Sequence, residues 1–113
     1  MDLVSKEQHQ AWLQAVITNP YRKLFIAYQG EQPVGTVRAD YAAHTDRHEL
    51  SWTVAPNARG KCVGKHMVKH LVETLNTKAR AEIKEGNGSS IKIATHAGLH
   101  LVAQKGDVLH YFN

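Results

Sequence analysis

A change of spacing among the apolar residues near the middle of the chain limits the possible folds more than any other feature. Residues 49–54 alternate between polar and apolar side chains, which is typical of a strand with one buried face. Residues 61–75 repeat their apolar positions at helical spacing, which predicts an amphipathic helix. Because Pro56 ends the strand pattern, residues 55–60 are expected to form a loop. A strand that leads directly into a helix favours a fold in which helices pack on a sheet.

Strand and helix patterns continue on both sides of this junction. Before it, residues 24–28 and 34–41 are rich in aromatic and branched side chains and flank a turn at residues 30–32, which predicts a hairpin. After it, strands and a helix are predicted at residues 79–84 (strand), 89–97 (helix), 99–103 (strand) and 108–112 (strand). This order predicts a mixed sheet with helices packed on its faces.

The N-terminal segment is predicted to be a further helix. Ser5 and Gln8 have the spacing of a capping box, and the Asn-Pro pair at 19–20 would end the helix. The apolar stripe of this helix consists of Trp12, Leu13, Val16 and Ile17.

The composition restricts the class of protein. At 113 residues the chain is long enough for one domain with its own core, which we expect to span residues 1–113. A single cysteine rules out an internal disulfide, and no apolar run has the roughly 20 residues of a membrane span. Because the first residues also lack the order of a secretion signal, the expected location is the cytoplasm. The formal charge of +4 favours anionic partners.

The loop between the central strand and the central helix has the features of an anion site. The first N–H groups of a helix have no partners within the helix, and they lie at the positive end of its dipole. Gly60 and Gly64 allow a close approach of the backbone, and Arg59, Lys61 and Lys65 add positive charge. The spacing of the glycines fits neither the nucleotide-triphosphate loop nor the dinucleotide fingerprint. The sequence therefore predicts a phosphate site of another kind at the start of the helix.

Residues 59–64 read R-G-K-C-V-G and resemble the coenzyme A loop of the GNAT superfamily of N-acetyltransferases. The family pattern is Arg or Gln, two residues, Gly, one residue, and Gly or Ala. The Val-Ala-Pro run at 54–56 is similar to the end of the strand that precedes this loop in the family. Two more matches are the Pro-Val-Gly run at 33–35 and the signature formed by Asn87, Ser90, Gly98 and Leu99. The resemblance extends from about residue 11 to residue 99.

The resemblance implies an α/β (α+β) fold, with a GNAT-like mixed, mostly antiparallel sheet and helices packed on both faces. It also implies acetyl-CoA as cosubstrate, no metal, and transfer of the acetyl group to a primary amine of a small molecule or protein. The amine would attack directly in a ternary complex. The residues that would bind the cofactor are Trp52, Thr53, Val54, Arg59, Gly60, Lys61, Cys62, Val63, Gly64, Lys65, Asn87 and Ser90. For Asn87 and Ser90, helix capping is an equally good explanation.

This chemistry needs a base for the amine and a donor for the developing oxyanion. By the resemblance, a backbone N–H near Val54 would stabilise the oxyanion. Glu49 is the candidate catalytic base, because it lies on the polar face of the strand that enters the site; an ordinary surface carboxylate is the alternative. His48 is the second candidate, since the ordinary pKa of histidine suits a base.

Three departures from the family pattern affect the expected activity. Cys62 stands where the family normally has Gly, and its side chain would crowd a pyrophosphate. Ala94 occupies the position of the usual general-acid Tyr, so water or Tyr111 would have to replace that acid. The chain also resembles a short form without the usual N-terminal strand and helix. We therefore expect a homodimer, or another partner, to cover the exposed edge strand.

Other classes of function fit the sequence less well. An acyl-CoA-binding module that has lost catalysis is the main alternative, and Cys62 and Ala94 both favour it. Three pairs of histidines with zinc-compatible spacing, at 44/48, 66/70 and 96/100, lack an obvious third ligand, so no metal site is expected. Nucleic-acid binding is not expected, because the basic residues are not interleaved with aromatic side chains. No residue pattern identifies the amine acceptor.

Overall fold

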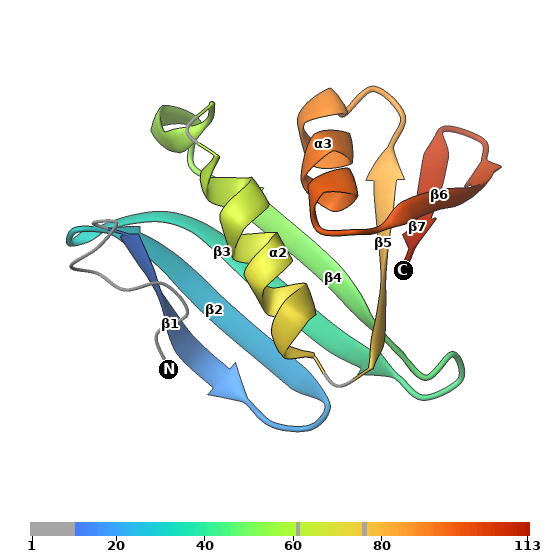
Figure 1. Cartoon of the computed structure of the whole chain (residues 1–113), viewed down its shortest axis with the longest axis horizontal. Coiled ribbons are helices and arrows are strands. Elements are labelled where there is room, and N and C mark those ends of the chain that lie inside the picture. Colours follow the sequence, from blue (N-terminus) through green and yellow to red (C-terminus); the bar gives the residue numbers. More distant parts are fainter. Residues whose placement is uncertain (1–10, 61, 76) are drawn as a thin grey trace.

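A seven-stranded sheet runs through the part of the chain that the structure, a computed structural model, describes: residues 11–60, 62–75 and 77–113 (Figure 1). The strand order is β1-β2-β3-β4-β5-β7-β6. The strands are β1 (Ala11–Thr18), β2 (Arg22–Gln29), β3 (Gln32–Ala42), β4 (Arg47–Val54), β5 (Lys78–Lys84), β6 (His100–Lys105) and β7 (Val108–Phe112). The helical elements are η1 (Pro56–Ala58), α2 (Val63–Thr74) and α3 (Gly88–His96).

The sheet is mixed and mostly antiparallel, as predicted. Strands β1 to β4 form an antiparallel meander, and β5, β7 and β6 pair antiparallel with one another. Among the strands of the described residues, only β4 and β5 pair in parallel, because α2 carries the chain from the end of β4 back to the beginning of β5. The strand–loop–helix junction predicted from the change of apolar spacing is thereby confirmed, together with the later strands and helix.

Both described helices pack on the same face of the sheet, whereas the resemblance implied helices on both faces. A Cβ added to Gly35 of β3 would lie 3.4 Å from the Met67 side chain of α2. On the same face, Trp52 Nε1 of β4 donates to Ser90 Oγ of α3 at 3.3 Å. The buried residues of β2, β3 and β4, including Phe25 and Val37, point toward this layer and form one core with the helices.

The opposite face of the sheet is polar along β3 and β4, although Leu24 and Ile26 of β2 also point to it. Asp40 of β3 lies 3.3 Å from Arg22 Nε and 3.0 Å from Arg38 Nε, and both arginines remain more than half exposed. Farther across the sheet, Glu49 and Arg80 are directly paired. Charged side chains that find partners at the surface gain little from a further layer of apolar cover.

The helix predicted near the N-terminus is wrong over residues 11–18, which form β1. Leu13 and Ile17 lie four positions apart, as on one face of a helix, but a bulge between Ala15 and Ile17 shifts the register of β1, so the two side chains point to opposite faces of the sheet. The β-branched run of Val16, Ile17 and Thr18 favours the strand, and the segment pairs with β2 along its length. The proposed capping residues, Ser5 and Gln8, lie outside the described residues. Within the described part of the chain, no helix has the length and apolar character needed to cross a bilayer.

Candidate functional site

The parallel strands β4 and β5 separate part of the way along their length. They pair only at Arg47 with Lys78, His48 with Ala79, and Glu49 with Arg80. Beyond Glu49, β4 continues to Val54 and diverges from β5, which pairs with β7 along its other edge (Figure 1). Because successive residues of a strand direct their N–H and C=O groups to alternate sides, part of the β4 backbone at 50–54 faces this gap. The gap is therefore lined by peptide groups that no neighbouring strand engages.

The gap ends at the loop that leads into α2. Arg59 Nε donates to the carbonyl oxygen of Val54 at 3.3 Å, which ties the loop back to the end of β4. Gly60 has a φ of +81°, and a Cβ at this position would meet nothing within 4 Å. The loop therefore needs Gly60 for its backbone conformation and leaves open space beside it. Lys61 lies outside the described residues.

The N-terminus of α2 points its free amides to this end of the gap. The first backbone bond of the helix runs from His66 N to the Cys62 carbonyl oxygen, at 3.1 Å. The amides of Val63, Gly64 and Lys65 precede it and so have no partner within the helix. Such amides bind anionic oxygens, and the helix dipole adds to the attraction.

Cys62 adopts a left-handed backbone conformation, with φ of +63° and ψ of +14°. This conformation costs an L-residue roughly 1–2 kcal/mol, whereas glycine adopts it freely. The position therefore favours glycine on backbone grounds alone, which is the residue that the GNAT pattern has there. The Cys62 side chain is exposed.

Gly64 sets the distance between the two helices. A Cβ at this position would lie 2.5 Å from Ile93 Cδ1 of α3 and 3.1 Å from Val54 Cγ2 of β4. Such distances are shorter than van der Waals contact, so only glycine allows this approach. The second glycine of the predicted loop thus leaves room for α3 and the end of β4 to pack closely against α2.

The other candidate cofactor residues divide between the two sides of the gap. Trp52 reaches from β4 to Ser90 of α3, so the indole bridges the two elements on the helical face. Asn87 Oδ1 accepts from the Ser90 amide at 3.1 Å, which confirms the capping explanation for Asn87. The Thr53 hydroxyl points to the polar face and shares a hydrogen bond of 2.8 Å with Thr36.

Glu49, the candidate base, lies where β4 and β5 stop pairing. Its Oε2 is 3.7 Å from Arg80 Nε, and its side chain is 53% exposed while that of Arg80 is 14% exposed. Arg80 also binds Glu82 at 2.5 Å. Sequence spacing singled out Glu49 but gave no sign of its pairing with Arg80, because that contact depends on the register of two strands far apart in the chain.

His48, the second candidate base, is enclosed on the helical face and is only 2% exposed. The Thr77 hydroxyl donates to the Lys78 carbonyl oxygen, so it accepts from His48 Nδ1 at 2.6 Å. Burial lowers the pKa of His48, and the charge of Lys23 lowers it further. A buried imidazole with one nitrogen already hydrogen-bonded is less accessible to an amine than Glu49.

Ala94 and Tyr111, the two positions considered for the general acid, lie on the helical face of the sheet. Ala94 is completely buried in α3 and supplies no polar atom. Tyr111 of β7 is 6% exposed and pairs with Ala81 of β5, beyond the point where β4 and β5 separate. No group of three or more metal-ligating side chains lies together among the described residues.

The chain belongs to the acetyltransferase (GNAT) family, whose sequence profile matches residues 2–99. No curated protein matches the sequence significantly. Many solved structures share the fold, and they include several acetyltransferases. These matches place the β4–β5 gap and the α2 loop in a GNAT framework.

Three solved structures illustrate the likeness. The GNAT domain of S. lividans PAT has 20% sequence identity and a TM-score of 0.72, with 81% of this chain and 60% of that chain covered. Campylobacter jejuni N-acetyltransferase PseH, in complex with acetyl coenzyme A, has 20% identity and a TM-score of 0.67 over 84% and 69%. Vibrio cholerae spermidine N-acetyltransferase, in complex with CoA and spermine, has 14% identity and a TM-score of 0.71 over 83% and 66%. The chain thus spans 60–69% of the length of these relatives.

Proposed function

We propose that this protein is an acetyl-CoA-dependent N-acetyltransferase that acetylates a primary amine of a small molecule or protein. The observation that carries the proposal is the separation of β4 from β5 beyond Glu49, directly beside the free N-terminus of α2. A gap lined by backbone and an anion site at its end suit a ligand that has an extended chain and a diphosphate. Membership of the GNAT family supports the same ligand.

The residues at this site fit coenzyme A. The amides of Val63, Gly64 and Lys65, with the flexible backbone of Gly60, would hold the diphosphate oxygens. The edge of β4 near Trp52 and Val54 would hold the extended pantetheine by backbone hydrogen bonds. The exposed Cys62 side chain beside these amides is the one feature that crowds the loop. Bound acetyl-CoA supplies the acetyl group as an activated thioester.

The protein's own groups would perform two tasks for the reaction. Glu49, at the point where the strands separate, would accept a proton from the ammonium form of the acceptor, directly or through water. A backbone N–H near Val54 would donate to the acetyl oxygen as negative charge develops there. The Ala94 position offers no acid, so water would protonate the departing thiolate.

Titration calorimetry with CoA, acetyl-CoA and ATP tests the cofactor assignment. We expect CoA and acetyl-CoA to bind much more tightly than ATP, because only they fill both the diphosphate site and the gap. Equal binding of all three would contradict a dedicated acyl-carrier site.

Turnover distinguishes an enzyme from a binding module. Thiol release from acetyl-CoA is measured against a panel of amines, and the acetylated product is identified by mass. Amine-dependent release supports the transferase. Tight CoA binding without turnover for any amine would support the alternative, a module that has lost catalysis.

A homodimer and a cytoplasmic location remain proposals. The edge strand β6 supports a dimer, because Leu101 and Val102 are 53% and 57% exposed there. Light scattering after gel filtration tests it: a monomer at high concentration would contradict the dimer. Cell fractionation tests the location, for which the single cysteine is the supporting feature.

A further inference from the structure

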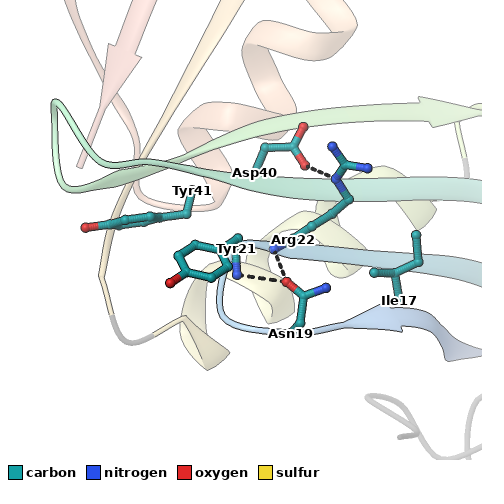
Figure 2. A pocket seen from close by; sticks show the side chains of 6 residues that line it. All are labelled: Ile17, Asn19, Tyr21, Arg22, Asp40 and Tyr41. Carbon is teal, nitrogen blue, oxygen red and sulfur yellow. Dashed lines mark hydrogen bonds and ion pairs between the residues drawn. The ribbon is translucent and has the colours of Figure 1, made fainter.

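A surface pocket of about 520 Å³ lies next to the turn between β1 and β2, and one of its lining residues, Asp40, is the strand partner of Glu49. It is lined by Ile17, Asn19, Tyr21, Arg22, Asp40 and Tyr41. Figure 2 shows Arg22 and Asp40 side by side, with Asn19 and Ile17 on the neighbouring strand end and the two tyrosines at one end. Its volume suits a small ligand.

Arg22 and Asp40, the charged groups that line this pocket, form an ion-pair network with Arg38, which is not one of the lining residues. Asp40 contacts Arg22 Nε through Oδ1 at 3.3 Å and Arg38 Nε through Oδ2 at 3.0 Å. The Oδ1 atom is buried and has no aligned hydrogen bond, so its contact with Arg22 is electrostatic. Both arginines use only Nε for Asp40, and no partner of their terminal nitrogens is found in the described part of the chain.

The two guanidinium groups therefore present their terminal N–H groups for another anion. Arg22 and Arg38 are 60% and 53% exposed, and together with Asp40 they carry a net charge of one positive unit. Asn19 adds a donor, because its Oδ1 already accepts from the amides of Tyr21 and Arg22, at 2.9 Å each, and leaves the NH₂ group. A planar fork of N–H groups matches a carboxylate in a bidentate manner.

The pocket is connected to Glu49 by strand register. Arg22 of β2, Asp40 of β3 and Glu49 of β4 are directly opposite one another and point to the same face. Neighbouring strands lie about 4.8 Å apart, so the backbone of Arg22 is about 10 Å from that of Glu49. A ligand whose anionic group binds the arginines could therefore place its amine at Glu49 if a few carbon atoms separate the two groups.

We propose that the acetyl acceptor is a small amine that carries a carboxylate, which Arg22 and Arg38 bind while its amine lies beside Glu49. This assignment rests on the proposed acetyltransferase function and names its substrate class. A carboxylate is favoured over a phosphate dianion because its single charge equals the net charge of the arginine–aspartate group. A second ammonium group is disfavoured, since both Asp40 oxygens already face arginines.

Three sets of amines of similar length test the proposal: ω-amino acids (β-alanine, γ-aminobutyrate, ε-aminocaproate), diamines (putrescine, cadaverine) and butylamine. We expect the ω-amino acids to have the highest kcat/KM, with an optimum at an intermediate length. Arg22→Gln and Arg38→Gln should each raise KM for ω-amino acids by about tenfold or more, since a charge-assisted hydrogen bond is lost. KM for butylamine should not change.

Lys105→Gln is the matched control, because it also removes one positive charge but lies on the distant β6 strand. Direct binding of γ-aminobutyrate, measured by NMR shifts without any cofactor, provides a readout independent of turnover, and both arginine variants should weaken it. If a variant fails to fold, the ligand series with the unaltered protein decides. A preference for diamines, or arginine variants that behave like Lys105→Gln, would overturn the proposal while leaving the transferase intact. Arginine-dependent binding of γ-aminobutyrate without CoA binding would instead support the pocket and refute the transferase.

Discussion

Glu49 and Arg80 are the last residues at which β4 and β5 pair, and Arg80 Nε lies 3.7 Å from Glu49 Oε2. Arg80 is fixed more firmly than its partner. It binds Glu82, and its guanidinium lies 5.4 Å from the centre of the Phe112 ring. The more exposed Glu49 carboxylate therefore lies where the gap between β4 and β5 begins, beside a positive charge that is held in place.

Glu49→Gln should reduce kcat by about a hundredfold or more, because general-base catalysis contributes roughly 10²–10⁴ in rate. The amide is nearly isosteric with the carboxylate but accepts no proton, so CoA affinity should not change. Glu73→Gln is the control, because Glu73 is an exposed residue of α2 whose ion pair with Lys69 lies elsewhere. Equal activity of the two variants would show that Glu49 is not the base.

Cys62→Gly should raise the free energy of unfolding by up to about 1 kcal/mol, because glycine relieves the left-handed backbone. Part of the gain is offset by the greater freedom of glycine in the unfolded chain. Urea denaturation measures the change. Cys62→Ala retains a Cβ, so it should give no such gain. If alanine stabilised the protein as much as glycine, the thiol rather than the backbone would be responsible.

Gly64→Ala should destabilise the fold by about 1–3 kcal/mol, the usual cost of overpacking, because the added Cβ would contact Ile93. The added Cβ would increase the distance between α2 and α3, and this change should also weaken the binding of CoA. Gly88→Ala is the matched control, because a Cβ at Gly88 meets nothing within 4 Å. Thermal unfolding and CoA titration of the two variants measure both effects. An unchanged Gly64→Ala protein would contradict the close contact of the helices.

Asn87→Ala should lower stability by about 1 kcal/mol, the typical loss when an N-cap side chain is removed. Asn87→Asp retains an acceptor for the Ser90 amide and should restore most of the stability. CoA affinity of the two variants separates capping from ligand binding. If Asp restores stability but not CoA affinity, Asn87 also contacts the cofactor, whose phosphates would repel the new carboxylate. If neither property changes in Asn87→Ala, both roles are refuted.

The stability of the protein should fall as the pH decreases through the ordinary histidine pKa of 6.5, because burial lowers the pKa of His48 in the folded state. Between the two pKa values the unfolded chain binds more protons, so acid favours unfolding. The loss should level off below the folded pKa. Urea denaturation at about pH 7.5 and about pH 5.5 measures it. His48→Gln should reduce the difference between the two conditions, and an unchanged difference would assign it to other groups.

Sequence periodicity predicts the central junction well, because residues 49–54 fit a strand and not a helix, and α2 fits only a helix. The N-terminal segment could not be assigned in the same way. Leu13 and Ile17 have helical spacing because a bulge in β1 interrupts the alternation of the strand, and pairing with β2, rather than local preference, selects the strand. The position of both helices on one face was also not predicted, because it depends on how the helices pack against the sheet and each other, which the periodicity of each segment does not specify.

The candidate site likewise has features that could be predicted from the sequence and features that could not. The glycine positions could be predicted from the sequence, because the loop is formed by a motif of adjacent residues. In the structure, Gly60 is required by its backbone conformation and Gly64 by close packing. The ion pairs of Asp40 and Glu49 could not be predicted from the sequence. They join residues of different strands, and only the register brings them together.

The gap beyond Glu49 is bounded by the main chain, and every residue type except proline carries the same peptide N–H and C=O groups. Replacement of one side chain by another along residues 50–54 therefore leaves these donors and acceptors unaltered, as long as the paths of the two strands do not change. A surface of this kind persists through extensive divergence, which agrees with a shared architecture at only 11–20% identity. Loss of this gap would accordingly require a change in the path of β4 or β5 rather than the replacement of any single side chain.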